Sequence, residues 1–246
     1  MSERVVRVTQ EATVIAYREF LRFGLERDPA ERLRQGVRGF LRSTRFSAIA
    51  VTSSDRGAGS HAIEHAHGYE PSTVDYIRDR FVTADPLYRA SVPTAAVNTW
   101  TGTGFEHSYA AERWLIPGGF HNGASVSIVD PELGELGSIH TNCRSPELGD
   151  REVEALTALA GFLSIELAQR RRREALGLTA REREVVRLIA EGASNPQIAA
   201  RLHVSRSTVS THVEHILRKF GTRSRVSVAV RAAALGLLVE DRSPGR

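Results

Sequence analysis

The chain has 246 residues, of which 41% are hydrophobic and 25% charged, and its formal net charge is +4. This composition is typical of a globular protein with room for a large and a small domain, and it argues against a disordered or fibrous chain. No signal-peptide pattern and no run of about 18 apolar residues occurs, so we expect a cytoplasmic protein without a membrane partner. The single cysteine, Cys143, rules out an internal disulfide and a cysteine metal cluster.

Hydrophobic periodicity and turn residues divide residues 1–169 into alternating helices and strands. Helices are predicted at 10–25, 29–43, 71–81, 107–115 and 149–174, and strands at 46–52, 61–67, 124–129 and 136–141. The DPELGEL segment at 130–136 predicts a hairpin between the last two strands. We therefore expect an α/β sandwich in which helices flank an antiparallel sheet.

The last predicted helix of this region carries an apolar stripe and then four arginines. Leu156, Leu159, Phe162, Leu163 and Leu167 form the stripe, and Arg170 to Arg173 follow it. The periodicity is compatible with a core position and with a dimer interface, and both stay open. Residues 170–177 are interpreted as a basic linker between the first domain and a second domain at 178–246.

Charge is distributed unevenly between the two parts of the chain. Residues 171–246 have a net charge of +8, and residues 1–170 have a net charge of −4. A basic excess confined to a small domain favours a polyanionic partner such as double-stranded DNA.

The second domain begins with two helices that carry their own start signals. Thr179 with Glu182, and Ser194 with Gln197, have the spacing of capping boxes, and Gly192 is placed to end the first helix. The link at His203 and Val204 is too short for anything but a tight turn. A short helix, a tight turn and a longer helix make a helix-turn-helix within an all-α domain of four helices.

The longer helix, which starts at Ser205, has an apolar side and a polar side. The apolar residues recur at helical spacing: Val209, Val213, Ile216, Leu217 and Phe220. The opposite side carries small polar residues first and cationic residues last, which suits base edges and phosphates respectively.

The segment 178–238 resembles the LuxR-type (GerE-like) helix-turn-helix domain. The matching positions include Thr179, Glu182, Gly192, Asn195, Ile198, Val209, Ile216 and Gly221. The resemblance implies base contacts early on the third helix, at Ser210, Thr211 and Glu214. The resemblance and the polar side of the third helix together predict six further DNA-binding residues: Ser205, Arg206, Ser207, Thr208, Arg218 and Lys219. A small helical module that does not bind DNA is the alternative.

The segment from Tyr76 to Gly123 resembles the autoinducer-binding domain of LuxR-type quorum-sensing regulators. Tyr76, Asp85 before Pro86, and Trp100 stand at the family's spacings, and Gly123 occupies the position of a strand glycine. The resemblance implies that these residues bind the head group of an N-acyl homoserine lactone. A helix cap for Asp85 and a plain core position for Trp100 are the alternatives.

Two further ligand positions depart from that pattern. Ser72 stands where the family has a tryptophan, and His140 stands where relatives have a small hydroxyl residue. The signal is therefore a lactone, a related small amphiphile or a non-lactone molecule, or the domain needs no ligand. No other cofactor is expected.

An enzyme is the competing class of function. His61, His65 and His67 are predicted to share one face of a strand, and such a trio could hold a metal in a hydrolase. A phosphorelay regulator is a second alternative, but the acidic pair of a receiver domain is missing from the first residues. We expect no catalytic or metal site, and we expect a homodimeric, ligand-responsive transcriptional regulator.

Overall fold

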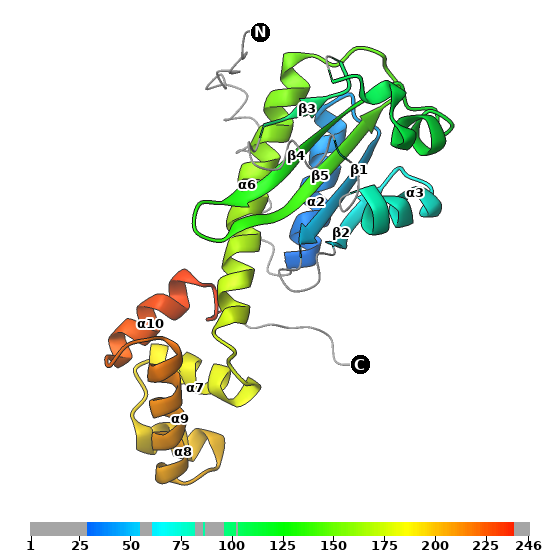
Figure 1. Ribbon diagram of the computed structural model, residues 1–246. Coiled ribbons are helices and arrows are strands. Elements are labelled where there is room, and N and C mark those ends of the chain that lie inside the picture. Colours follow the sequence, from blue (N-terminus) through cyan, green and yellow to red (C-terminus); the bar gives the residue numbers. More distant parts are fainter. Residues whose placement is uncertain (1–28, 55–60, 82–85, 87–95, 102, 239–246) are drawn as a thin grey trace. The chain divides into compact units, whose positions relative to one another are not determined.

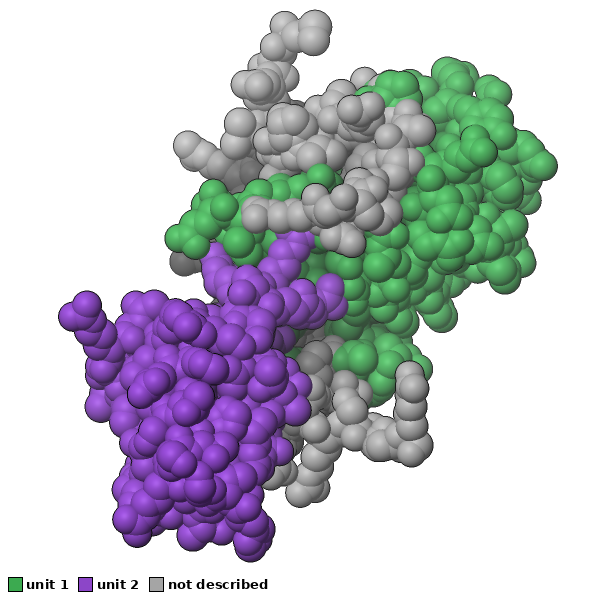
Figure 2. All heavy atoms as spheres, turned by 60° about the horizontal axis from the view of Figure 1, so that its bottom comes forward, with its two compact units in different colours: residues 1–167 green, residues 168–246 purple. Residues whose placement is uncertain are grey.

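The computed structural model describes residues 29–54, 61–81, 86, 96–101 and 103–238 (Figure 1). The helix predicted at 10–25, and Asp85, lie outside the described residues. The chain divides into two compact units, residues 1–167 and 168–246, which Figure 2 distinguishes by colour. No helix among the described residues is both long and apolar enough to span a membrane.

Unit 1 contains a five-stranded sheet in the order β2-β1-β5-β4-β3, and every neighbouring pair is antiparallel. The strands are β1 (Ala48–Ser54), β2 (His61–His67), β3 (Asn98–Thr99), β4 (Asn122–Asp130) and β5 (Gly134–Cys143). The predicted antiparallel sheet is confirmed. Only β3 has no predicted counterpart.

The predicted hairpin joins β4 to β5. Asp130 Oδ1 accepts hydrogen bonds from the backbone N–H groups of Glu132 (3.0 Å) and Leu133 (2.9 Å). Gly134 follows with φ of 73°, a left-handed conformation that glycine adopts without steric cost. This turn fixes the register in which Ser125 lies opposite His140.

Helices α2 (Pro29–Ser43) and α6 (Asp150–Ala175) cover one face of the sheet (Figure 1). Ser164 of α6 donates a hydrogen bond to the carbonyl of Val129 (2.6 Å), and Arg32 of α2 pairs with Glu166 (3.2 Å). The apolar stripe of α6 is buried within this one chain, apart from a half-buried Phe162, so its core interpretation holds: Leu156, Leu159, Leu163 and Leu167.

The other face carries short helices. These are α3 (Pro71–Tyr76), the π-helix η1 (Ile77–Phe81), the 3₁₀-helix η3 (Phe105–His107) and the π-helix η4 (Ala111–Leu115). The helix predicted at 71–81 is thus present but changes its winding at Ile77. The helix predicted at 107–115 is present from Tyr109 to Leu115, after a bend at Ser108 that separates it from η3. Short π-helical segments are rare in proteins, and those that occur are frequently located at functional sites.

The described part of unit 2 is all-α, as predicted; after the end of α6 it contains helices α7 (Ala180–Ala190), α8 (Asn195–Leu202), α9 (Arg206–Lys219) and α10 (Arg225–Ala234). One apolar core joins all four helices: Val185, Val186, Ile189, Ile198, Val209, Ile216, Phe220, Val228 and Ala232. The segment 170–177, interpreted as a basic linker, is helical over most of its length, because α6 continues to Ala175.

The surroundings of two glycines in unit 1 predict opposite effects of an alanine substitution on the free energy of unfolding. A Cβ atom on Gly137 would lie 2.0 Å from the carbonyl oxygen of Thr52, whereas one on Gly161, inside α6, would meet nothing within 4 Å. Gly137→Ala should lower the free energy of unfolding of unit 1 by about 1–3 kcal/mol. Gly161→Ala should raise it by about 0.5–1 kcal/mol, because alanine is the better helix former.

Urea unfolding followed by tryptophan fluorescence measures this, because both tryptophans, Trp100 and Trp114, belong to unit 1. Equal effects of the two substitutions would contradict the described approach of β5 to β1.

Candidate nucleic-acid interface and ligand pocket

Helix α9 buries one side and exposes the other. Val209, Val213, Ile216 and Phe220 are each at most 8% exposed and lie in the core of unit 2. The opposite side is solvent-exposed and carries polar and charged residues: Arg206, Ser207, Thr211, Glu214 and Arg218. The core therefore determines which side of α9 a partner can contact.

The tight turn before α9 is formed by a histidine in an unusual backbone conformation. His203 has φ of 54°, the only left-handed non-glycine residue among those described. It ends α8, and Ser205 then caps α9 by accepting a hydrogen bond from the N–H of Thr208 (3.0 Å). The hydroxyls of Ser207 and Thr208 lie within 2.8 Å of the same Ser205 oxygen. The first turn of α9 is thereby fixed.

A hydrogen-bond network ties the polar side of α9 to α8 and α10. Arg225 donates to Asn195 Oδ1 (2.8 Å) and to the carbonyl of Ala193 (2.8 Å). Asn195 in turn donates to Ser210 Oγ (3.3 Å), which also donates to the carbonyl of Arg206 (3.1 Å). Ser210 was predicted to contact bases. Its hydrogen bonds show that it also helps to hold α9 against α8.

Lys219 was predicted to contact DNA phosphates, but its ammonium group is hydrogen-bonded within unit 2. Its ammonium group donates to Glu182 Oε2 (2.6 Å) and to the carbonyl of Gly177 (2.7 Å). Glu182 also completes the predicted capping box by accepting from the N–H of Thr179 (2.7 Å). This intradomain pair argues against the phosphate contact predicted for Lys219.

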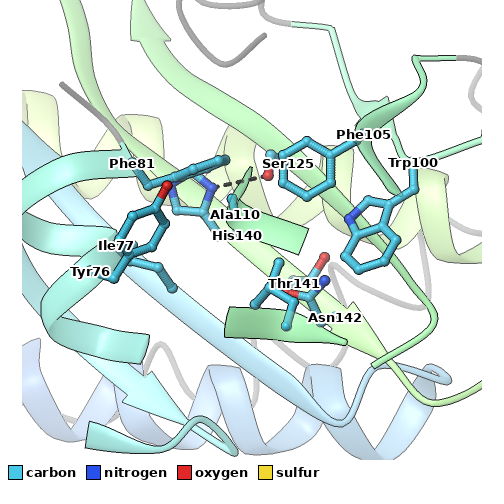
Figure 3. Close-up of a pocket in the computed structure, with 11 residues that line it drawn as sticks. Tyr76, Ile77, Phe81, Trp100, Phe105, Ala110, Ser125, His140, Thr141 and Asn142 are labelled. Carbon is cyan, nitrogen blue, oxygen red and sulfur yellow. Dashed lines mark hydrogen bonds between the residues drawn. The ribbon is translucent and has the colours of Figure 1, made fainter. Parts of the chain in front are cut away.

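Unit 1 contains a pocket between the sheet and the short helices (Figure 3). Aromatic and aliphatic side chains form most of its wall, and strands β4 and β5 form a polar floor. The lining residues are Tyr76, Ile77, Phe81, Trp100, Phe105, Ala110, Leu115, Ser125, His140, Thr141 and Asn142. Both π-helices contribute to the wall.

The aromatic rings pack closely on one another and on His140. Phe81 meets the His140 ring edge-on at 5.0 Å and the Phe105 ring at 5.8 Å, and Trp100 lies 5.2 Å from Phe105. Tyr76 stacks on Trp114 at 5.2 Å. The remaining cavity has a volume of about 20 Å³, which is room for a single water molecule.

His140 is the polar centre of the floor. It is 3% exposed, its Nδ1 lies 3.0 Å from Ser125 Oγ, and its Nε2 lies 2.8 Å from Ser138 Oγ. Burial, with a smaller contribution from the charge of His61, lowers the pKa of the imidazole to about 3. The ring is therefore neutral at physiological pH.

The structure brings together some of the predicted ligand residues and separates others. Tyr76, Trp100 and His140 line the same pocket, whereas Ser72 is exposed on α3. A Cβ on Gly123 would lie 2.6 Å from the carbonyl oxygen of Thr141 and 2.9 Å from the Trp100 indole nitrogen, and the amide of Asn142 would be closer still, so β5 and Trp100 together leave no room for a side chain there. Asp85 cannot be placed, because it is outside the described residues.

Sequence reasoning missed Ser125 and the aromatic residues Phe81 and Phe105. The register of the predicted hairpin could have indicated Ser125, because it lies directly opposite His140. The two phenylalanines had no local signal of this kind.

The prediction of three histidines on one strand face is wrong. The register of β2 against β1 shifts between Val51 and Thr52, which inserts an extra residue and reverses the alternation of side chains. His65 lies opposite Val51, while His61 lies on the other face, with its Nδ1 3.0 Å from Thr52 Oγ1. No group of three metal-ligating side chains occurs within the described part of the chain.

The pair of Glu182 and Lys219 predicts a pH dependence for unit 2. Burial opposes ionisation of Glu182, but the hydrogen bonds from Lys219 and Thr179 outweigh it and hold the pKa of this carboxyl below its ordinary value. Because the folded-state pKa is the lower one, the stabilisation is complete above the ordinary value near 4.5 and is lost as the pH falls through the lowered pKa.

Glu182→Gln should remove the acid-dependent contribution of this carboxyl to the free energy of unfolding. At neutral pH it should lower the stability of unit 2 by about 1.5–3 kcal/mol. Far-UV circular dichroism of urea unfolding between neutral and acid pH measures it. Glu184→Gln is the control, because Glu184 forms an exposed pair with Arg181. The same acid dependence in Glu182→Gln and the unaltered chain would contradict the assignment.

Comparison with known proteins places unit 2 in a family. The family model described as bacterial regulatory proteins, luxR family, matches residues 176–232. A putative HTH-type transcriptional regulator of Mycobacterium bovis is 44% identical over 100 residues, which are 36% of this chain and 11% of that protein. The nitrate/nitrite response regulator protein NarL of Escherichia coli is 46% identical over 78 residues, which are 31% of this chain and 36% of NarL. The chain thus spans 11% of the length of the first of these curated relatives and 36% of the second.

Solved structures resemble the chain over nearly its whole length. Escherichia coli SdiA matches with a TM-score of 0.51 and 21% identity, covering 92% of this chain and 99% of SdiA. SdiA in complex with octanoyl-rac-glycerol matches with a TM-score of 0.53 and 20% identity, covering 96% and 100%. At these identities the similarity establishes a shared fold. The match to the luxR family of bacterial regulatory proteins, at residues 176–232, covers the helix-turn-helix of unit 2.

Proposed function

We propose that this chain is a DNA-binding transcriptional regulator of the LuxR type whose first unit responds to a small molecule. The observation that carries the proposal is the solvent-exposed polar side of α9. The apolar side of the same helix is buried in the core of unit 2, and the helix lies within the segment that matches the luxR family. The basic excess of residues 171–246 supports it, because a phosphate backbone attracts such a surface. DNA as the partner also favours the predicted cytoplasmic location.

In this proposal the side chains of α9 have different tasks. Thr211 and Glu214 contact base edges, since both are exposed at the middle of the helix. Arg206 and Arg218 contact phosphates at either end, and the network from Arg225 to Ser210 positions the helix. A glutamate among the base-contacting residues favours a cytosine amino group.

A homodimer suits a module that contacts only one half-site. Helix α10 exposes two valines one turn apart, Val226 at 73% and Val230 at 63%. Exposed apolar side chains at this spacing form a small patch that a second copy of the chain can cover.

The effector in this proposal is a small amphiphile such as an N-acyl homoserine lactone. The shared fold with SdiA supports it, as does the meeting of Tyr76, Trp100 and His140 in one pocket. Since the cavity holds only about 20 Å³, a ligand must displace aromatic side chains and so stabilise an expanded state. Binding then stabilises the folded unit by an amount set by the ratio of ligand concentration to its dissociation constant.

The same small cavity favours a second candidate, a regulator whose first unit folds without any signal. The rings of Phe81, Phe105 and Trp100 already fill most of the space. Purification of a folded chain from a host that makes no acyl lactone would favour this candidate.

Substitution of two arginines tests the DNA interface. Arg206→Ala and Arg218→Ala should each weaken the binding of duplex DNA roughly tenfold, about 1.4 kcal/mol, and to a similar extent for every DNA sequence. Fluorescence anisotropy with a labelled random-sequence duplex and the full chain measures the affinity.

Arg151→Ala removes the same charge from an exposed position on α6 in unit 1 and is the matched control. If all three variants lost affinity equally, net charge rather than the exposed side of α9 would account for binding.

A further inference from the structure

Each described helix end in unit 2 is closed by a cationic side chain that comes from a different helix. The last carbonyl groups of a helix have no partner within it and carry a partial negative charge, so lysine and arginine stabilise them. The pairs of donor and acceptor carbonyl are Lys219 and Gly177 after α6 (2.7 Å), Arg225 and Ala193 after α7 (2.8 Å), Arg181 and Leu202 of α8 (2.6 Å), Arg231 and Phe220 after α9 (2.6 Å), and Arg173 and Leu235 after α10 (3.1 Å). The charges of these side chains are therefore used within unit 2.

Three exposed arginines are used differently. Arg206, Arg218 and Arg223 have no hydrogen bond or ion pair within the described part of the chain. Arg206 begins α9, Arg218 lies in its last turn, and Arg223 lies in the segment that joins α9 to α10 (Figure 1). Arg223 thus adds an unpaired positive charge at the same end of α9 as Arg218.

The backbone on both sides of Arg223 is held directly after α9. The N–H of Thr222 donates to the carbonyl of Leu217 (3.0 Å), and the N–H of Ser224 donates to Thr222 Oγ1 (3.2 Å). Ser224 then caps α10 by accepting a hydrogen bond from the N–H of Ser227 (3.3 Å). A side chain on a turn that is already held has little backbone freedom to lose when it binds a partner.

Arg225, two residues further along the chain, has partners inside unit 2. Its guanidinium group is half-buried and donates to Asn195 Oδ1 (2.8 Å) and to the carbonyl of Ala193 (2.8 Å). Asn195 donates to Ser210 Oγ (3.3 Å), and Ser210 Oγ donates to the carbonyl of Arg206 (3.1 Å). The planar fork of the guanidinium group fixes both of its acceptors at once. Arg225 therefore acts on α9 through Asn195.

We infer that Arg223 binds a DNA phosphate, whereas Arg225 contacts no phosphate and is a positioning residue for α9. The inference rests on the proposed function, because it assumes that unit 2 binds DNA. An arginine that neutralises a phosphate releases a counterion from the DNA, and an arginine paired inside the protein does not. The salt dependence of binding therefore distinguishes two residues that have equal charge and are nearly adjacent.

The test compares Arg223→Gln with Arg225→Gln in the full chain. Fluorescence anisotropy with a labelled random-sequence duplex measures the association constant between about 50 and 200 mM salt. Arg223→Gln should weaken binding at the lowest salt roughly three- to tenfold. It should also make the logarithmic salt slope less steep by about 0.9, the contribution of one phosphate. Its midpoint of urea unfolding should equal that of the unaltered chain.

Arg225→Gln should weaken binding by a similar factor but leave the salt slope almost unchanged. Its midpoint of urea unfolding should fall, because two hydrogen bonds of a charged group are lost. Affinities are compared where circular dichroism shows each variant folded, so a role in stability alone would leave the affinity unchanged. Asn195→Ala removes the link to Ser210 without removing a charge and should weaken binding in the same way. It decides the positioning role if Arg225→Gln does not fold.

The outcomes separate the inference from the proposed function. If Arg223→Gln leaves the slope unchanged, or if Arg225→Gln reduces the slope as much as Arg223→Gln does, the inference is overturned while DNA binding stands. It is also overturned if the folded Arg225→Gln chain, or Asn195→Ala in its place, binds as tightly as the unaltered chain. If the unaltered chain shows no salt-dependent binding of the duplex, the proposed function and the inference both fail.

Discussion

The burial of one side of α9 is the constraint on which the interface depends. Val209, Val213, Ile216 and Phe220 anchor the helix in a core shared by all four helices of unit 2. A rotation of α9 about its axis would expose these side chains and bury Arg206 or Glu214, at a cost of several kcal/mol for the apolar groups alone. The caps and the network from Arg225 to Ser210 then fix the position of the helix along its axis.

The pocket of unit 1 follows a different logic. Its wall is apolar and closely packed, and its floor contains the buried His140, whose two ring nitrogens both lie within hydrogen-bond distance of serine hydroxyls of the sheet. Buried polar groups with complete hydrogen bonding impose geometry on their neighbours. Ser125, whose hydroxyl lies 3.0 Å from His140 Nδ1, is the polar group of this floor on β4. The entry of a ligand requires rings such as Phe81 to move, which couples binding to the packing of the unit.

Much of the fold followed from periodicity and turn chemistry. The capping boxes at Thr179 and Ser194, the apolar side of α9 and the turn after Asp130 are local signals, and the structure has each of them. The features that could not be predicted depend on contacts between distant segments. The register shift between β1 and β2 separates His61 from His65, and Lys219 reaches Glu182, 37 residues away along the chain. The winding change at Ile77 also carried no local signal.

The dependence of DNA affinity on salt tests the central claim most directly. If the exposed side of α9 lies against phosphates, the logarithm of the association constant must fall linearly with the logarithm of salt concentration, with a slope of about −0.9 for each phosphate contacted. For the full chain on a duplex between about 50 and 200 mM salt, we predict a negative slope whose size corresponds to several phosphate contacts. A slope of zero, or no binding at the lowest salt, would contradict the account.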